Sequence, residues 1–341
     1  MHGSIWCNTS FTVRLGATFQ SGNVTSAANQ SDMDAVPVCF IEAVLRRARR
    51  YNNHVHLLTK FSGLWGKLGM NYAKNSCYLQ ISICAIGERP MESRELSPEV
   101  LREKSKNIRS ITFNISGISN SHWDDWKKVS PEKEKYITKL LQRLDAPDKE
   151  LGMGYNSGLD ESSLREIFSK YSKLFESFSS LTLWEFDAPA FVNLAQSMVS
   201  TGRLQSICIW DPVPPVLPSS FWVDYFFSES CRELDAHFED PSVVPELINR
   251  WKQLDPRTLT PLKVCDGIRT SPDTLVDVGM KPIPLETADP EVLGKIQRRF
   301  INTIASLHCI DHPTHPHVKI YVIVFIGLSR KPMDEFALLF D

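Results

Sequence analysis

The sequence lacks the features of a secreted, disulfide-bonded or membrane-spanning protein. Its eight cysteines, spread over 341 residues, include no C-x-x-C pair, and this usage is typical of reduced thiols rather than of a disulfide framework. The first 20 residues show no basic start followed by an apolar core, and the longest apolar run, 318–328, is too short to cross a bilayer. We therefore expect a soluble protein of the cytoplasm or nucleus with no membrane partner.

The chain also lacks a strong net charge. Its formal net charge is −2, with 23% charged and 42% hydrophobic residues, so no field of the whole protein attracts nucleic acid or anionic lipid. The short basic run at 46–50 is expected to be a solvated face of a helix. We expect no nucleic-acid partner.

Catalytic and cofactor motifs are missing as well. Neither G-x-S-x-G nor H-E-x-x-H occurs. Gly152, Gly154 and Gly158 miss the dinucleotide-binding fingerprint by one spacing, and they follow a charged helical stretch rather than a strand. Residues 63–67 lack the full spacing of a P-loop. The sequence therefore predicts no enzyme and no cofactor.

One cluster near the C-terminal end has the composition of a metal site. Six potential zinc ligands lie within ten residues: His308, Cys309, Asp311, His312, His315 and His317. However, Pro313 and Pro316 break any helical spacing of these ligands, and no matching pair occurs elsewhere. The sequence favours a solvated loop between a helix and a strand with no metal bound, and a small zinc-dependent enzyme is an alternative.

What the sequence does contain is one short pattern that recurs four times, with starts 26, 27 and 28 residues apart. The pattern, apolar-x-x-apolar-x-apolar, occupies 178–183, 204–209, 231–236 and 259–264. A period in the twenties with this core is typical of a leucine-rich-repeat-like array. The last three residues of each unit are predicted to form a short strand with its apolar side inward. Chance recurrence in an ordinary α/β domain is the alternative.

Amphipathic stretches precede or separate these strands. They lie at 164–178, 189–199 and 241–254. Each has an apolar face that one strand–helix unit cannot cover alone, so neighbouring units are expected to stack.

The strand alternation predicts which side chains lie on the opposite, open side of the strand layer. They are Thr182, Trp184, Cys208, Trp210, Asp235, His237, Lys263 and Cys265. If the strands stack in register, Trp184 and Trp210 are neighbours and would form a binding hot spot. Alternatively, the loop 211–219 folds over the two tryptophans and buries them. The surface expected to bind a protein substrate comprises Trp184, Trp210, Asp235, His237 and Lys263.

The ends of the chain differ from the repeats. Residues 1–32 lack periodicity and are predicted to be a disordered leader. A helix is predicted to start at Asp289-Pro290 with an apolar face that reaches Leu307. Residues 318–325 are predicted to form a closing strand, and the last dozen residues a fraying or capping tail.

A small helical module is predicted over 33–75, where three short helices with apolar faces follow one another. A bundle of this size is marginal alone and usually packs on a partner. Val36-Pro37, Val44-Leu45 and Phe61-Ser62-x-x-Trp65 resemble the F-box, whose outline is Leu-Pro, then Ile-Leu, then Val-Ser-x-x-Trp. An F-box followed by leucine-rich-repeat-like units is similar to divergent F-box proteins with FTH-type C-terminal regions.

This resemblance implies a fold and a function. The expected fold class is α/β: an irregular leucine-rich-repeat-like array over 76–341, preceded by a small all-α F-box-like module. The protein would be a substrate-recruiting adaptor of a cullin–RING ubiquitin ligase, with a protein substrate on the repeat face. The residues expected to bind the Skp-type adaptor are Pro37, Phe40, Leu45, Phe61 and Trp65. The alternative is a repeat-type protein-interaction module with no ubiquitin-ligase role, in which the helical segment only caps the array.

Overall fold

The structure, a computed structural model, shows an α/β protein that divides into two compact units, Met1–Glu150 and Leu151–Asp341. The two units are described separately below. The described residues are 2–7, 36–47, 63–75, 77–84, 92–93, 103, 105, 108–116, 127–128, 131–144, 146, 148–153, 160–260, 263–268, 276, 278–300, 303–326 and 335–340. Among the helices in these ranges, none is long and apolar enough to cross a membrane.

The first unit contains a small sheet in the order β1-β2-β4. Strand β1 (His2–Cys7) pairs antiparallel with β2 (Cys77–Cys84), and β2 pairs parallel with β4 (Ile108–Ser116). From Ile111 to Ile115 of β4 every second side chain is buried, so one face of the strand supplies a core. The unit also contains the short pair β3 (Glu92–Ser93) and β5 (Lys127–Lys128), and the helix α6 (Pro131–Arg143).

Strand β1 corrects part of the prediction for the leader. Residues 2–7 were expected to be disordered, but their backbone extends the sheet beside β2. Strand addition at a sheet edge is made by main-chain hydrogen bonds, so the irregular side-chain pattern of this segment does not reveal it. Residues 8–32 lie outside the described residues.

A helix pair occupies the range of the predicted helical module. Helix α2 (Val38–Arg47) contacts α4 (Gly63–Asn75). Helix α2 starts just after Pro37, whose carbonyl accepts hydrogen bonds from the backbone N–H groups of Phe40 (2.9 Å) and Ile41 (3.2 Å). Proline suits this position because its missing N–H would have no partner inside the helix. The middle helix predicted for this module lies outside the described residues.

In the second unit the sheet order is β7-β8-β9-β10-β14-β13-β12-β11. Its parallel strands are β7 (Ser180–Leu183), β8 (Ser206–Val213), β9 (Glu233–Phe238) and β10 (Lys263–Ile268). Leu181 pairs with Ile207, and Ile207 pairs with Leu234. The first three segments that carry the repeated pattern therefore lie side by side in chain order, and the next strand of the sheet, β10, overlaps the fourth segment only at 263–264.

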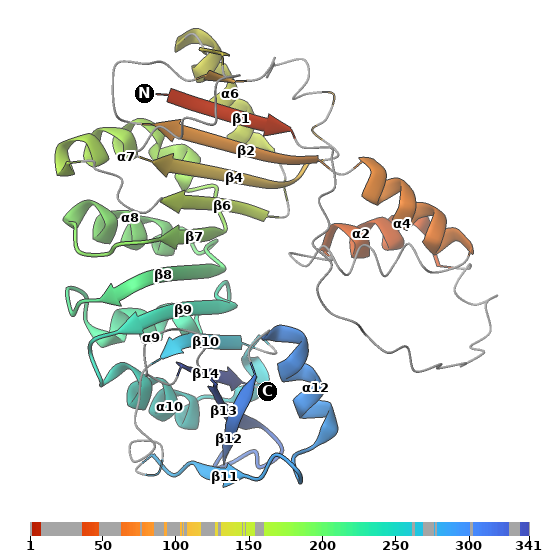
Figure 1. The fold of residues 1–341 in the computed structure, drawn as a ribbon, viewed down its shortest axis with the longest axis vertical. Helices are drawn as coiled ribbons and strands as arrows, with labels where there is room; N and C mark the ends of the chain where they lie inside the picture. Colours follow the sequence, from red (N-terminus) through yellow and green to blue (C-terminus); the bar gives the residue numbers. More distant parts are fainter. Residues whose placement is uncertain are drawn as a thin grey trace. The chain divides into compact units, whose positions relative to one another are not determined.

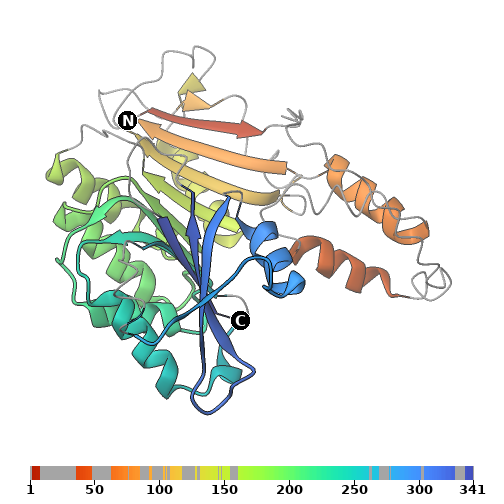
Figure 2. The same ribbon diagram turned by 60° about the horizontal axis from the view of Figure 1, so that its bottom comes forward.

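Four helices cover one face of these parallel strands (Figures 1 and 2). They are α7 (Glu161–Phe175), α8 (Pro189–Ser200), α9 (Ser219–Phe227) and α10 (Val243–Gln253). Three of them match predicted amphipathic stretches, whereas α9 has no predicted counterpart. Helix α7 begins at the N-cap Asp160, whose carboxylate accepts from the backbone N–H of Ser163 at 2.7 Å.

The fourth repeat is out of its predicted register. The repeat pattern predicts that Leu262 lies beside Leu234, but the residue that pairs with Leu234 is Cys265. The connection before β10 contains an extra 3₁₀ turn, η2 (Pro256–Thr258). Asp255 stabilises that turn by accepting from the backbone N–H of Arg257 at 3.0 Å. This longer connection moves the whole of β10, and a shift by an odd number of residues exchanges the two faces of a strand.

The C-terminal part of the second unit is antiparallel. Strand β14 (Glu335–Phe340) lies between β10 and β13 (Lys319–Phe325), followed by β12 (Ile304–Asp311) and β11 (Lys281–Ile283). Three expectations are therefore wrong. The helix α12 (Pro290–Arg299) ends well before Leu307, which belongs to β12. Residues 335–340, within the last dozen, form an interior strand rather than a tail, and the strand at 318–325 does not close the sheet.

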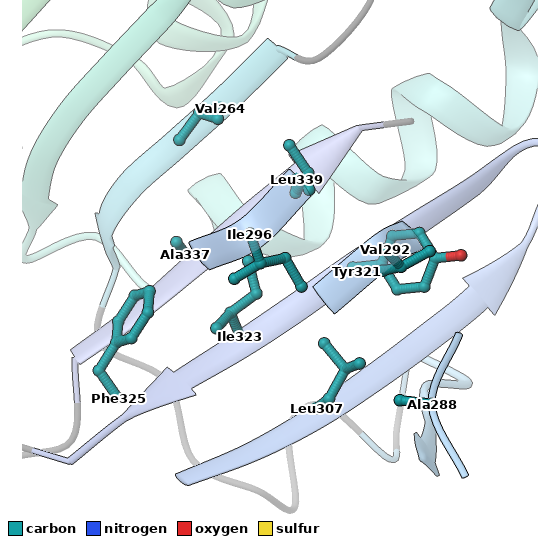
Figure 3. Close-up of a cluster of buried hydrophobic side chains, with 10 residues drawn as sticks. All are labelled: Val264, Ala288, Val292, Ile296, Leu307, Tyr321, Ile323, Phe325, Ala337 and Leu339. Carbon is teal, nitrogen blue, oxygen red and sulfur yellow. The ribbon is translucent and has the colours of Figure 1, made fainter. Parts of the chain in front are cut away.

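Both faces of β14 are covered. Phe340 contacts Phe226 of α9 and Trp251 of α10, with ring centroids 4.9 and 6.4 Å away. Ala337 and Leu339 lie on the other face, in a buried cluster with residues of α12, β10, β12 and β13 (Figure 3). Helix α12 thus covers the face opposite to α9 and α10. In sequence, a strand buried on both faces is a continuous apolar run rather than an alternation of apolar and polar residues. Residues 336–340 form such a run.

Candidate binding surface

The face of β7, β8 and β9 opposite the helices, here called the open face, carries a polar row that Asp266 of β10 continues. Thr182, Cys208, Asp235 and Asp266 pair with one another at the same level of successive strands. The Cys208 thiol donates a hydrogen bond to Asp235 Oδ2 at 3.2 Å. Asp266 accepts from the backbone N–H of Gly267 at 2.8 Å. Asp235 and His237, two residues further along β9, are half-buried on this face as expected.

Gly267 allows the close approach of β9 and β10 at this row. Its φ is +74°, a conformation that residues with a side chain rarely adopt. A Cβ at this position would lie 3.0 Å from Asp235 Oδ1 and 3.1 Å from the backbone of Ala236. A glycine is therefore required where β10 presents Asp266 to the open face.

Two tryptophans stack on each other beside the row, each two residues further along its strand. The ring centroids of Trp184 and Trp210 are 5.3 Å apart, with an interplanar angle of 18°. Their backbones are joined as well, because the N–H of Asp211 donates to the carbonyl of Trp184 at 2.9 Å. Trp184 is 37% exposed and Trp210 58% exposed. The prediction that they are neighbours is confirmed, and the alternative that 211–219 buries them is wrong.

Lys263 was expected on this surface, and that placement is wrong. The register of β10 directs its side chain to the helix-covered face, where it is only 1% exposed. Its Nζ donates to the carbonyls of Phe226 (2.6 Å) and Ser228 (2.7 Å), at the C-terminal end of α9. A cation at a helix C-terminus stabilises the unpaired carbonyls there. Cys265 is likewise buried rather than on the open face, and Asp266 takes its place.

Burial determines the titration of these groups. It lowers the pKa of the Lys263 amine, partly offset by the nearby Cys231 thiolate. Burial raises the pKa of the Cys231 thiol to about 11 and that of Cys265 well above its ordinary value. Since a thiolate is the reactive form of cysteine, neither thiol is suited to nucleophilic chemistry.

No protein family, no curated protein and no solved structure matches this chain. The interpretation of its surfaces therefore depends on their own geometry.

The helix pair of the first unit exposes an apolar surface. Phe40 is 54% exposed and Pro37 is exposed, whereas Trp65 is half-buried. Val38 on α2 and Met70 on α4 add two exposed apolar side chains that the sequence pattern did not single out. Leu45 faces the interior at 1% exposure, so its expected contact with an adaptor is corrected. Phe61 lies outside the described residues.

The histidine-rich segment near the C-terminal end is a packed strand and turn. Asp311 forms an ion pair with Lys319, with Oδ1 2.6 Å from Nζ. His312 is buried, and its ring stands edge-on to Trp251 at 4.6 Å. The backbone N–H of Thr314 donates to His312 Nδ1 (3.3 Å), so Nε2 carries the hydrogen that bonds to the Trp251 carbonyl at 3.0 Å. Among the described residues, no group of three or more histidine, cysteine or acidic side chains is placed to hold a metal ion.

A groove with a volume of about 210 Å³ lies between α7 and α8. Its lining includes apolar side chains (Phe168, Leu194 and Met198) and two charged ones (Arg165 and Glu176).

Replacing Lys263 with Met should lower the free energy of unfolding by about 1–3 kcal/mol at neutral pH, because two carbonyls at the end of α9 lose their donor. Urea unfolding measures this loss, and Lys281→Met, at an exposed position of β11, should change the free energy of unfolding little.

The difference in stability between the unmodified protein and Lys263→Met should depend on pH, because the pKa of Lys263 is lowered in the folded protein. The unfolded chain binds more protons as pH approaches 10.5, so the stability advantage of the unmodified protein over Lys263→Met should grow with pH. A constant or shrinking advantage would contradict the buried placement.

Replacing His312 with Ala should lower the free energy of unfolding by about 1–3 kcal/mol, because the Trp251 carbonyl loses its hydrogen bond in a buried site. His317→Ala, at an exposed position of the same turn, is the matched control and should be nearly neutral. Added zinc should leave the unfolding midpoint of the unmodified protein unchanged. A zinc-dependent increase that His312→Ala abolishes would show a metal site here.

Proposed function

We propose that the protein is a substrate-recruiting adaptor of a cullin–RING ubiquitin ligase, which binds the Skp-type adaptor through α2 and α4. The observation that carries this proposal is the exposed apolar surface of the helix pair. Val38 and Phe40 project from α2 and Met70 from α4, while Ile41 and Leu45 of α2 are buried. The pair therefore buries part of its apolar surface and leaves three large apolar side chains exposed.

Exposed apolar side chains on helices are suited to packing against another helical surface. The F-box resemblance of Val36-Pro37, Val44-Leu45 and Phe61-Ser62-x-x-Trp65 supports a Skp-type adaptor as that partner. In this proposal the open face of the second unit holds a protein substrate. No side-chain chemistry is required of the protein, since ubiquitin transfer would be performed by other components of the ligase.

A second candidate function is a protein-interaction module with no ubiquitin-ligase role. The stacked and exposed Trp184 and Trp210 favour it, because tryptophan is enriched among the residues that dominate binding energy at protein interfaces. In this alternative the helices α2 and α4 only stabilise the first unit, and the open face of the second unit binds the partner.

Phe40→Ala should weaken capture of a purified Skp-type adaptor by about tenfold or more, because a phenyl group buried at an interface contributes about 1.5–3 kcal/mol. The replacement should leave the unfolding midpoint nearly unchanged, since Phe40 is exposed. Capture on immobilised adaptor, followed by a binding titration, measures the effect. Ile326→Ala is the control, because Ile326 has the same exposed fraction, 55% against 54%, in the other unit. Equal capture of Phe40→Ala and the unmodified protein, or no capture of either, would reject the ligase role in favour of the second candidate.

A further inference from the structure

We propose that the stacked Trp184 and Trp210, with the carboxylates that surround the ends of their strands, bind an arginine side chain of an extended partner segment. The proposal deepens the proposed function, because it gives the chemistry of the substrate that the open face would hold. It rests on that function only for the partner's role as a substrate.

The tryptophan stack provides the platform. In a stacked pair each ring covers one face of the other, so binding depends on the outer faces and edges. Trp210 is the more exposed of the two, and its indole is supported from beneath by Trp184 at 5.3 Å. The backbone hydrogen bond from Asp211 to Trp184 holds the two strands together at this point. The platform is therefore preorganised, which lowers the cost of binding.

The charges around the platform are of one sign. Glu185 and Asp187 follow β7, Asp211 lies in β8 directly after Trp210, and Glu239 follows β9. Because side chains alternate along a strand, Asp211 belongs to the face opposite to Trp210, whereas Glu239 continues the open-face side of β9. The side-chain carboxylates of these four residues form no hydrogen bond or ion pair with any described residue. They lie at the C-terminal ends of the parallel strands.

Positive charge is found at the opposite ends of these strands. Between residues 180 and 240 the only lysine or arginine residues are Arg203 and Arg232. They precede β8 and β9 respectively, and parallel pairing places the starts of these strands at the same edge of the sheet. Within 180–240, the tryptophan end of the strands therefore carries acidic side chains and no lysine or arginine.

An aromatic face combined with acidic side chains selects a cation. The quadrupole of an indole attracts a cation placed over its face, and tryptophan is the best of the aromatic side chains in this respect. A guanidinium suits the platform better than an ammonium, because it is planar, stacks on aromatic rings and can donate to a carboxylate at the same time. An acidic or phosphorylated segment would be repelled by the same carboxylates.

The test uses the full chain and three short synthetic peptides that differ only at their charged positions. The probes carry arginine, citrulline (neutral and nearly the same shape as arginine) or lysine, alternating with serine and glycine. Binding is measured by calorimetric titration at low salt. The arginine peptide should bind with a Kd below about 1 mM. The citrulline peptide should bind at least about fivefold more weakly, as expected for loss of a cation–π contact, and the lysine peptide should fall between the two.

Variants assign this binding to the platform. Trp210→Ala should weaken the arginine peptide by about fivefold or more, whereas Ile326→Ala, at a similarly exposed apolar side chain, should have no effect. The variant Glu239→Gln, at the open-face side of β9, should reduce both the affinity and its dependence on salt.

The proposal would be overturned by the absence of arginine-peptide binding, by equal binding of the citrulline or lysine peptide, or by unchanged binding to Trp210→Ala. None of these outcomes depends on the Skp-type adaptor. If the protein binds the arginine peptide but is not captured by the Skp-type adaptor, the ligase role alone is rejected. If it is captured by the adaptor but does not bind the peptide, the arginine site alone is rejected.

Discussion

The in-register pairing of the parallel strands is the constraint on which the second unit depends. Leu181, Ile207 and Leu234 form one apolar row because β7, β8 and β9 pair without offset, and helices cover that row. The same pairing places Thr182, Cys208 and Asp235 in a row on the other face. Because side chains alternate along a strand, burying the first row leaves the second on the open face. The polar row and the tryptophan stack are thus consequences of how the core is packed.

Strand β10, where the regular register ends, shows what happens when this constraint changes. The additional turn before β10 changes its register, so Lys263 points toward the helices and Asp266 toward the open face. Lys263 then donates to the last carbonyls of α9, which would otherwise be buried without a donor. Lys263, which the sequence pattern placed on the surface, therefore links β10 to α9 in the interior.

The sequence could predict those parts of the fold in which one face is buried. The apolar rows of β7, β8 and β9, the helix between β9 and β10, and the neighbouring positions of Trp184 and Trp210 all follow from periodicity. The pattern could not reveal strands covered on both faces, such as β14, because 336–340 show no alternation. Helix α9 escaped prediction for a related reason, since Trp222, Val223, Tyr225 and Phe226 are all buried and leave little polar face. The error at Lys263 has another cause: a 3₁₀ turn in a connection leaves no periodic trace.

Strand β14 also has a consequence for how the second unit is made. It pairs with β10 on one side and β13 on the other, although both of these precede it in the chain. During synthesis on a ribosome, β10 and β13 are complete before the strand that joins them has been translated. Their unpaired edges are then available to other chains, which is the condition under which nascent proteins aggregate or recruit chaperones. The two parts of this sheet can therefore be united only after β14 has been synthesised.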